Sequence, residues 1–375
     1  MKIIIATPLY QPEIAEPAPY VKKLAENLKN DHKITVIAYT NNKEEIPGTR
    51  LIAIQKNQPI VLRLIKYTFE LSKASRDANV IYVPNGIASS LPAIIVSILN
   101  KTPIIIKFTG DEAWERSIQL GLTSQSLEDF LVKPKVSFKI LLIMVLQGFI
   151  LRQSKFITTS SNYLKKSISK AYKIDNKKII INYNPAPKKE TLPFPTEKNP
   201  NKIFTSTEFA TKEDIKNTIR AIKKTGGDLK LFITGKLKDE KELRGFSREL
   251  EIEKQIIFLG DVSKAENWYE LKTSALQIIN RNKKNEPDIV LKGFMAKTPT
   301  IATNVEGINE AVINGESGII VETNNSDKIA KEIKKVLNDE SLVKSLIAGG
   351  EKVIFEKFSW KNHLKTINKI LTGIK

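Results

Sequence analysis

The sequence predicts an α/β fold in which two domains each contain a parallel β-sheet. Three observations predict it. The chain has 375 residues, which is long for a single core but suits two domains of ordinary size. Short runs of β-branched residues alternate with amphipathic stretches at helical spacing along both halves. A segment with five prolines and no periodicity, residues 184–202, separates the two halves.

In the first half, strand patterns and helix patterns follow one another from the start of the chain. The predicted strands are apolar along their whole length, which is typical of a parallel sheet with helices on both faces. We expect strands at residues 2–6, 33–38, 79–83, 103–108, 156–159 and 178–183, and helices at 18–28, 60–71, 90–99, 136–151 and 162–171.

The same alternation restarts after the proline-rich segment. A final amphipathic stretch at residues 360–371 predicts one more helix at the end of the chain. We expect strands at residues 203–206, 230–234, 256–259, 275–279, 300–302 and 318–321, and helices at 212–225, 240–250, 265–272, 288–296, 308–312, 326–337 and 340–355.

The composition restricts the chemistry. Without cysteine, the chain has no disulfide, iron–sulfur cluster or thiolate zinc site. Two histidines, His32 and His363, leave little material for a histidine metal site, and we expect no metal. The net charge of +19 attracts phosphates or anionic lipid, although solvated lysines explain it equally well. Because arginine is scarce beside lysine and no cluster of arginine with aromatic residues occurs, we expect no nucleic-acid partner.

One stretch is strongly apolar. Residues 138–151 read FKILLIMVLQGFIL, but they include Lys139 and Gln147. The stretch falls short of the roughly 20 apolar residues that a membrane span needs. It predicts either a buried helix or a helix at a membrane interface. Residues 1–6 read as a first strand and not as a signal peptide.

The most informative motif lies in the second half. Residues 287–321 read PDIVLKGFMAKTPTIATNVEGINEAVINGESGIIV. The segment resembles the GT-B fold glycosyltransferases of family 4, also called glycosyl transferases group 1. Its matching features are a turn and strand at 298–303, a loop at 304–307, an Asn309-Glu310 pair where the family has Pro-Glu, and a hairpin at 314–318.

This resemblance implies a GT-B fold, with two Rossmann-like domains facing a central cleft. The expected domains are residues 1–186 for the acceptor and 203–355 for the nucleotide-sugar, joined by a linker at 187–202. Residues 356–375 would cross back to the first domain. The implied reaction moves a sugar from a UDP- or GDP-linked donor to a glycan or lipid-linked hydroxyl, with retention and without a metal or other cofactor. The implied location is the cytoplasm, peripherally on an anionic inner membrane face.

The implied donor site begins at the helix that follows Pro287. Proline suits the first turn of a helix, where its missing N–H costs nothing. A helix N-terminus with unbonded amides binds a diphosphate. We therefore expect the free amides of that turn to bind the donor, namely those of Asp288, Ile289, Val290 and Leu291.

Charged side chains complete the implied donor site. Lys212 matches a family lysine that opens a helix, and we expect it to neutralise the diphosphate in binding and catalysis. Thr207 and Ser206 replace the arginine and glycine that usually precede it. Glu310 is assigned to the donor by its Asn-Glu match.

Two family glutamates fall at Lys284 and Lys292 in this sequence. An ammonium group can only donate hydrogen bonds, whereas a carboxylate accepts them from sugar hydroxyls. Three interpretations stay open: the lysines hold phosphate charge, a neighbouring Glu286 or Asp288 supplies the carboxylate, or both lysines are solvated.

The implied acceptor site lies in the first half. Residues 107–116, KFTGDEAWER, follow a predicted strand, and the ends of parallel strands face the ligand crevice. The sequence is similar to the T-G-D-x-A-W-E motif of one family branch. This similarity implies a catalytic Asp111 and an acceptor site made by Asn85, Thr109, Glu112, Trp114 and Glu115, although a tryptophan at such a place is often part of the core.

Several family positions are altered, and they motivate an alternative from another class of protein. A glycosyltransferase-like protein that has lost catalysis would serve as a binding or scaffold protein. The altered positions are Ala15 and Glu16, where the family has two glycines, Gly110, where many members have histidine, and Thr207, Lys284 and Lys292.

Overall fold

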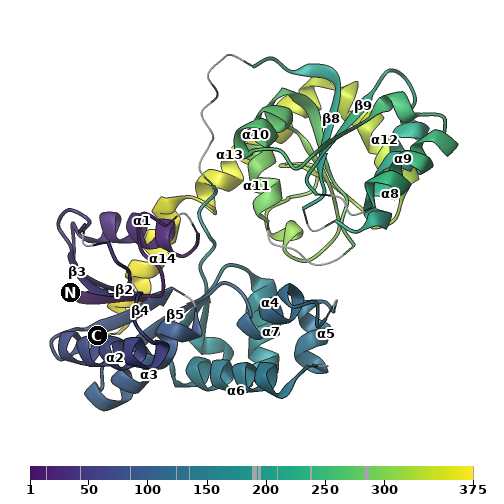
Figure 1. Ribbon diagram of the computed structural model, residues 1–375. Helices are drawn as coiled ribbons and strands as arrows, with labels where there is room; N and C mark the ends of the chain where they lie inside the picture. The colour runs from purple at the N-terminus through teal and green to yellow at the C-terminus, as the bar shows by residue number, and fades with distance from the viewer. Residues whose placement is uncertain are drawn as a thin grey trace. The chain divides into compact units, whose positions relative to one another are not determined.

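The computed structural model describes residues 1–374 except 14, 43, 85, 124, 135, 188–191, 193–195, 209, 237–238 and 283–286. The chain divides into two compact units, one formed by Met1–Tyr183 with His363–Lys375 and the other by Asn184–Asn362. We call them unit 1 and unit 2 and describe each by itself. Each unit contains one parallel sheet with helices packed around it (Figure 1).

Unit 1 is built on a seven-stranded sheet with the order β3-β2-β1-β4-β5-β6-β7, and all its pairings are parallel. The strand order reverses direction between β1 and β4, and such a switch point opens a crevice at the carboxyl ends of the strands. The strands are β1 Lys2–Thr7, β2 Lys33–Tyr39, β3 Arg50–Ile54, β4 Val80–Pro84, β5 Ile104–Phe108, β6 Phe156–Thr159 and β7 Ile179–Ile181.

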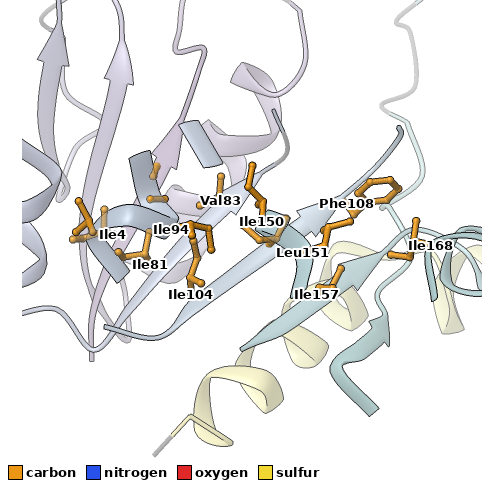
Figure 2. Close-up of a cluster of buried hydrophobic side chains, with 14 of the residues drawn as sticks. Ile4, Ile81, Val83, Ile94, Ile104, Phe108, Ile150, Leu151, Ile157 and Ile168 are labelled. Carbon is orange, nitrogen blue, oxygen red and sulfur yellow. The ribbon is translucent and has the colours of Figure 1, made fainter. Parts of the chain in front are cut away.

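Helices cover both faces of this sheet. Helices α2, α3 and α6 lie next to one another, since α3 packs against both of the others (Figure 1). The core beneath them joins strand residues such as Ile81 and Ile104 to helix residues such as Ile94 and Ile150 (Figure 2). The helices of unit 1 are α1 Ala18–Leu28, α2 Ile60–Ser75, α3 Ile87–Asn100, α4 Glu112–Gln119, α5 Leu127–Val132, α6 Phe138–Gln153, α7 Asn162–Tyr172 and α14 Trp360–Thr372, with a 3-10 turn at Asn176–Lys178.

Unit 2 is built on a six-stranded parallel sheet with the order β10-β9-β8-β11-β12-β13. Its switch point lies between β8 and β11. The strands are β8 Asn199–Ser206, β9 Lys230–Thr234, β10 Ile256–Gly260, β11 Ser274–Ile279, β12 Thr300–Thr303 and β13 Ile319–Val321. The helices are α8 Lys212–Thr225, α9 Glu240–Glu249, α10 Lys264–Thr273, α11 Asp288–Met295, α12 Ser326–Leu337 and α13 Glu340–Glu356, with 3-10 turns at Glu253–Gln255 and Ile308–Glu310.

A buried histidine ties helix α14 to the rest of unit 1. The Nδ1 atom of His363 lies 2.8 Å from the carbonyl oxygen of Tyr183, and its Nε2 atom lies 2.9 Å from the hydroxyl of Tyr20. That hydroxyl lies 2.8 Å from the hydroxyl of Tyr82 on β4. Burial, helped by the charge of Lys107, lowers the pKa of His363 to about 3. The ring is therefore neutral at pH 7, with one nitrogen donating and the other accepting.

The structure differs from the sequence-based expectation in five places. Strand β3 and the short helices α4 and α5 were not predicted, and the helix expected at 308–312 is only the 3-10 turn Ile308–Glu310. The chain turns there because Ile313 enters a hairpin, in which its amide donates to the Ser317 hydroxyl at 2.8 Å. Strand β8 begins at Asn199, inside the expected linker, because Asn199 pairs with Ser274 of β11.

Helix α6 corresponds to the apolar stretch at 138–151. Ile140, Ile150 and Leu151 are buried, whereas Phe138 and Val145 are exposed. The helix is thus buried on one side only. Among the described helices, none combines the length and the apolar character needed to cross a bilayer.

Candidate functional site

A buried arginine occupies the switch point of unit 2. Arg281 follows strand β11 and is 1% exposed. Its Nη2 donates to the carbonyl oxygens of Ser206 at 2.6 Å and Glu208 at 2.9 Å. Its Nε donates to the same Glu208 oxygen at 3.2 Å, and its Nη1 donates to the carbonyl of Asn280 at 2.8 Å. Arg281 therefore fixes the segment that follows β8 from the neighbouring strand.

Burial is the main influence on the charge of Arg281. It lowers the pKa of the guanidinium to about 10, while Asp214 and Glu208 act in the opposite direction. The group is still a cation at neutral pH. Sequence reasoning missed this residue, although one signal was available: an arginine directly after a buried strand, in a chain that otherwise prefers lysine.

Thr207 stands where the family has arginine, and its polar atoms are hydrogen-bonded within unit 2. It is buried, its amide donates to the Thr234 carbonyl at 2.8 Å, and its hydroxyl donates to the Lys236 carbonyl at 3.3 Å. Its side chain fills the space that a side chain on Gly235 would need, and the φ of +102° at that position also favours glycine. Position 207 therefore brings no cation to this loop, whose carbonyl oxygens accept from Arg281.

Lys212 opens helix α8, as its match to the family predicts. Thr211 caps the helix in a capping box with Asp214. The ammonium group of Lys212 lies 2.7 Å from one oxygen of Glu242 on α9, and Lys216 lies 2.7 Å from the other. The hydrogen bond with Glu242 raises the pKa of Lys212, and the two lysines lower the pKa of Glu242 to about 2. This exposed ion pair is weak enough to exchange partners with an arriving phosphate.

Helix α11 starts at the switch point, but its first turn differs from the expectation. The amides of Val290 and Leu291 both donate to the carbonyl of Pro287, at 2.9 and 3.0 Å. The expectation that these two amides are free was therefore wrong, because Pro287 is the N-cap residue and its carbonyl starts the helical bonding. Asp288 is exposed, whereas the side chains of Ile289, Val290 and Leu291 are buried.

Lys292 has a carboxylate partner across the switch point. Its ammonium lies 3.3 Å from an oxygen of Glu208, which belongs to the segment held by Arg281. Lys284 lies outside the described residues. Glu310 lies in the 3-10 turn Ile308–Glu310, and the ammonium of Lys357 donates to its carbonyl. Of the predicted donor residues that the structure describes, Lys292 is the one whose side chain pairs with the loop after β8, residues 207–211, which we call the β8 loop.

In unit 1, Asp111 has a structural role that the prediction of a catalytic residue did not foresee. It is fully buried and caps α4, where it accepts the Trp114 amide at 2.9 Å. Its second oxygen accepts from Gln147 at 2.6 Å and from the Tyr172 hydroxyl at 2.5 Å. Burial raises the pKa of Asp111 despite these bonds. The Asp111 carboxylate thus joins α4, α6 and α7 through these hydrogen bonds.

Two of the neighbouring acceptor candidates, Glu112 and Trp114, make hydrogen bonds within unit 1. Glu112 accepts the Ile87 amide at 2.9 Å and pairs with Arg116 at 3.1 Å. The indole of Trp114 donates to the Gln125 carbonyl at 3.1 Å and packs against the core. Glu112 and Trp114 therefore both stabilise the local fold. Thr109 is half-buried at the end of β5, and Asn85 lies outside the described residues.

Glu115 differs from Glu112 and Trp114 in the contacts of its side chain. Among the described residues, no hydrogen bond or ion pair engages its carboxylate. Partial burial, together with Asp111 and Glu112, raises its pKa. Its carboxylate fills the space that a side chain on Gly110 would enter. A carboxylate of this chain thus stands where many relatives place a histidine side chain.

The described residues gather no group of three or more His, Cys, Asp or Glu side chains suited to a metal ion.

Comparison with known proteins defines the class. Solved structures superpose on the whole chain: Anabaena Alr3699/HepE in complex with UDP gives a TM-score of 0.69 at 14% identity, covering 100% of both chains. The lipopolysaccharide outer core galactosyltransferase WaaB gives 0.65 at 16% identity, also over 100% of both. The fold is GT-B.

The family model described as glycosyl transferases group 1 matches residues 188–353. The second half of the chain is thus similar to this family. The uncharacterized glycosyltransferase MJ1178 of Methanocaldococcus jannaschii is 28% identical over 162 residues, which are 43% of this chain and 45% of that protein. CapM of Staphylococcus aureus, a capsular polysaccharide biosynthesis glycosyltransferase, is 39% identical over 72 residues, 19% of each chain. The matches thus span less than two thirds of these relatives.

Proposed function

We propose that this protein is a glycosyltransferase that moves a sugar from a UDP- or GDP-linked donor to a hydroxyl of a glycan or lipid-linked acceptor. The observation that carries the proposal is the switch point of unit 2, which lies within the range matched by the family model. There the β8 loop, held by Arg281, meets the start of α11 across the Glu208–Lys292 pair. The superposition with a UDP-bound glycosyltransferase agrees with a nucleotide donor.

The cations near this switch point suit a diphosphate. Lys212 and Lys292 each pair with an exposed carboxylate, and a phosphate would compete for both ammonium groups. Developing charge on the leaving diphosphate is best stabilised by fixed donors that are already oriented. We propose that Lys212 and Lys292 supply this stabilisation in place of a metal ion, and that transfer proceeds with retention.

The donor sugar needs an acceptor of hydrogen bonds, because sugar hydroxyls donate. The family glutamate is replaced by Lys292, but Glu208 lies 3.3 Å from that ammonium. Once a phosphate takes the ammonium, the carboxylate is released to accept from a hydroxyl. We propose Glu208 for this role.

On the acceptor side, we propose that Glu115 binds the attacking hydroxyl. It lies just beyond the carboxyl end of β5, its carboxylate has no partner among the described residues, and its raised pKa makes it a better proton acceptor than an ordinary glutamate. Glu115→Gln should then lower the transfer rate and leave donor binding unchanged.

Calorimetry with UDP and GDP, with and without EDTA, tests the proposal directly. We expect one nucleotide to bind with the same affinity in EDTA, and its sugar derivative to be hydrolysed or transferred with retention, read by NMR of the anomeric proton. If neither nucleotide binds and no sugar derivative raises the melting temperature, the protein is instead a glycosyltransferase-like binding protein without catalysis.

A further inference from the structure

Unit 2 has a recess at the opposite end of its sheet from the switch point. The recess has a volume of about 440 Å³, a size that holds small ligands, and it lies beside the first residues of β8 and β9. Its lining includes Asn199 and Lys202 of β8, Phe232 of β9 and Tyr269 of α10. Lys202 is four residues from Ser206, where β8 ends, which is about 13 Å at a rise of roughly 3.3 Å per residue. We call this recess the amino-end recess.

Three lysines bring positive charge to the amino-end recess. Lys202 is buried in its lining. Lys198 is an exposed residue directly before β8, but its ammonium turns inward and donates to the Ser274 carbonyl at 2.8 Å and the Thr298 hydroxyl at 2.6 Å. Lys272 on α10 is half-buried. Burial, together with the charges of Lys272 and Lys202, lowers the pKa of Lys198 to about 7. Positive charge therefore dominates at the Lys198 ammonium.

Carboxylates compensate only part of this charge. Glu270 on α10 lies 2.5 Å from the Lys202 ammonium, which also donates to the Thr273 hydroxyl at 2.7 Å. Glu197 lines the recess as well, but it is exposed to water. Among the residues that the structure describes, no ion pair engages Lys198 or Lys272. An anion in the recess would supply the negative charge that these lysines lack.

Aromatic rings accompany the cations. The Lys202 ammonium lies 4.5 Å from the centre of the Phe232 ring and 5.3 Å from the centre of the Tyr269 ring. Both aromatic residues are half-buried in the lining of the recess. A ligand with an anionic group at one end and a ring at the other can therefore contact the cation and an aromatic side chain together.

We propose that the amino-end recess binds a phosphate monoester whose organic part carries a ring. The phosphate group lies against Lys202, within the field of Lys198 and Lys272. The ring lies against Phe232 or Tyr269. The recess is at the amino end of β8, whereas the proposed donor site is at its carboxyl end. Binding there requires neither a nucleotide-sugar nor a transfer step, so the proposal is independent of the proposed reaction.

Calorimetry of the whole protein with sulfate tests the anion site, because sulfate stays a dianion at neutral and basic pH. A protonated Lys198 should strengthen binding about tenfold, the scale of one hydrogen bond from a charged group. Since this lysine is half protonated at pH 7, binding should weaken roughly fivefold between pH 7 and pH 9. Binding near pH 8 should also take up protons, seen as a heat that depends on the buffer. Sulfate affinity without pH dependence or proton uptake would overturn the proposal.

Matched variants locate the anion site. Lys198→Gln should weaken sulfate binding at pH 7 roughly fivefold and remove its pH dependence, because glutamine cannot be protonated. Lys331→Gln is the control, since Lys331 is an exposed lysine of unit 2 on α12. Lys212→Gln, at the proposed donor site, should keep the pH-dependent binding. If Lys212→Gln removes the pH-dependent binding and Lys198→Gln does not, sulfate binds at the switch point and the proposal is wrong.

Phenyl phosphate and inorganic phosphate, compared at one pH, test the class of ligand. Phenyl phosphate should bind roughly fivefold more tightly, because its ring gains contact with an aromatic side chain. Phe232→Leu keeps an apolar side chain without the ring and should reduce this preference. Equal affinity of the wild type for the two compounds would refute a ring-bearing ester as the ligand. Thermal melting checks that each variant is folded.

Discussion

Arg281 offers the sharpest test of how unit 2 is organised. Replacing it with methionine keeps much of the side-chain volume but removes four hydrogen bonds to the carbonyls of Ser206, Glu208 and Asn280. At about 1.5 kcal/mol for each charge-assisted bond, the loss is about 6 kcal/mol. The lowering of the pKa to about 10 indicates that burying the cation costs roughly 3 kcal/mol, which the substitution returns. Arg281→Met should therefore destabilise unit 2 by about 3 kcal/mol.

Urea unfolding followed by circular dichroism measures the loss, and hydrogen exchange at residues 203–208 shows whether it falls on the β8 loop. Arg248→Met is the matched control: its side chain is 62% exposed, and its pair with Glu253 at 3.6 Å should contribute less than about 1 kcal/mol. Arg281→Lys keeps the positive charge but lacks the planar guanidinium group. Its loss of stability should lie between those of Arg281→Met and Arg248→Met. If Arg281→Met lies within about 1 kcal/mol of the wild type, the assignment of Arg281 as the support of this loop is wrong.

Two further predictions concern unit 1. The pKa of His363 is about 3 in the folded protein and about 6.5 in the unfolded chain, so stability is lost as the pH falls through 6.5. Moving from pH 7 to pH 5 should therefore lower the free energy of unfolding in urea by about 2 kcal/mol. His363→Gln should reduce this pH dependence. Gly110→Ala places a methyl group against the Glu115 carboxylate, whose flexible end moves aside. That variant should raise the acceptor KM while nucleotide affinity and melting temperature stay near wild type; an unchanged KM would count against Glu115.

The fold could be predicted from the sequence because its determinants are local. Apolar strands of five or six residues and amphipathic helices repeat in order, and parallel sheets follow from that order. The elements that were missed are short or lie next to polar motifs. Helix α4 is eight residues long and carries the acceptor motif, so its residues were interpreted as ligands although Asp111 caps the helix. Strand β3 lies at the edge of its sheet and is only five residues long, although four of its residues are apolar.

The site was harder to predict, since its partners are far apart along the chain. Lys212 and Glu242 are 30 residues apart, and Lys292 and Glu208 are 84 apart. No periodicity in a single sequence connects them. The resemblance supplied the positions of the lysines, but only the sheet order brings β8 and β11 together and so reveals their carboxylates.

Two of the altered family positions in unit 2 lie at the same loop. Thr207 belongs to the loop whose carbonyls accept from Arg281, and Lys292 pairs with Glu208 of that loop. We expect these altered positions to act together. If the rearrangement is functional, Lys292→Glu alone should weaken nucleotide binding, because it leaves two carboxylates facing each other near a diphosphate. Adding Glu208→Lys should restore part of the affinity, while folding changes by less than about 1 kcal/mol in either variant since the pair is exposed. Calorimetry on the two single variants and the double variant measures the coupling. Additive effects on nucleotide affinity would show that the two residues act independently, and the connection argued from their 3.3 Å contact would fail.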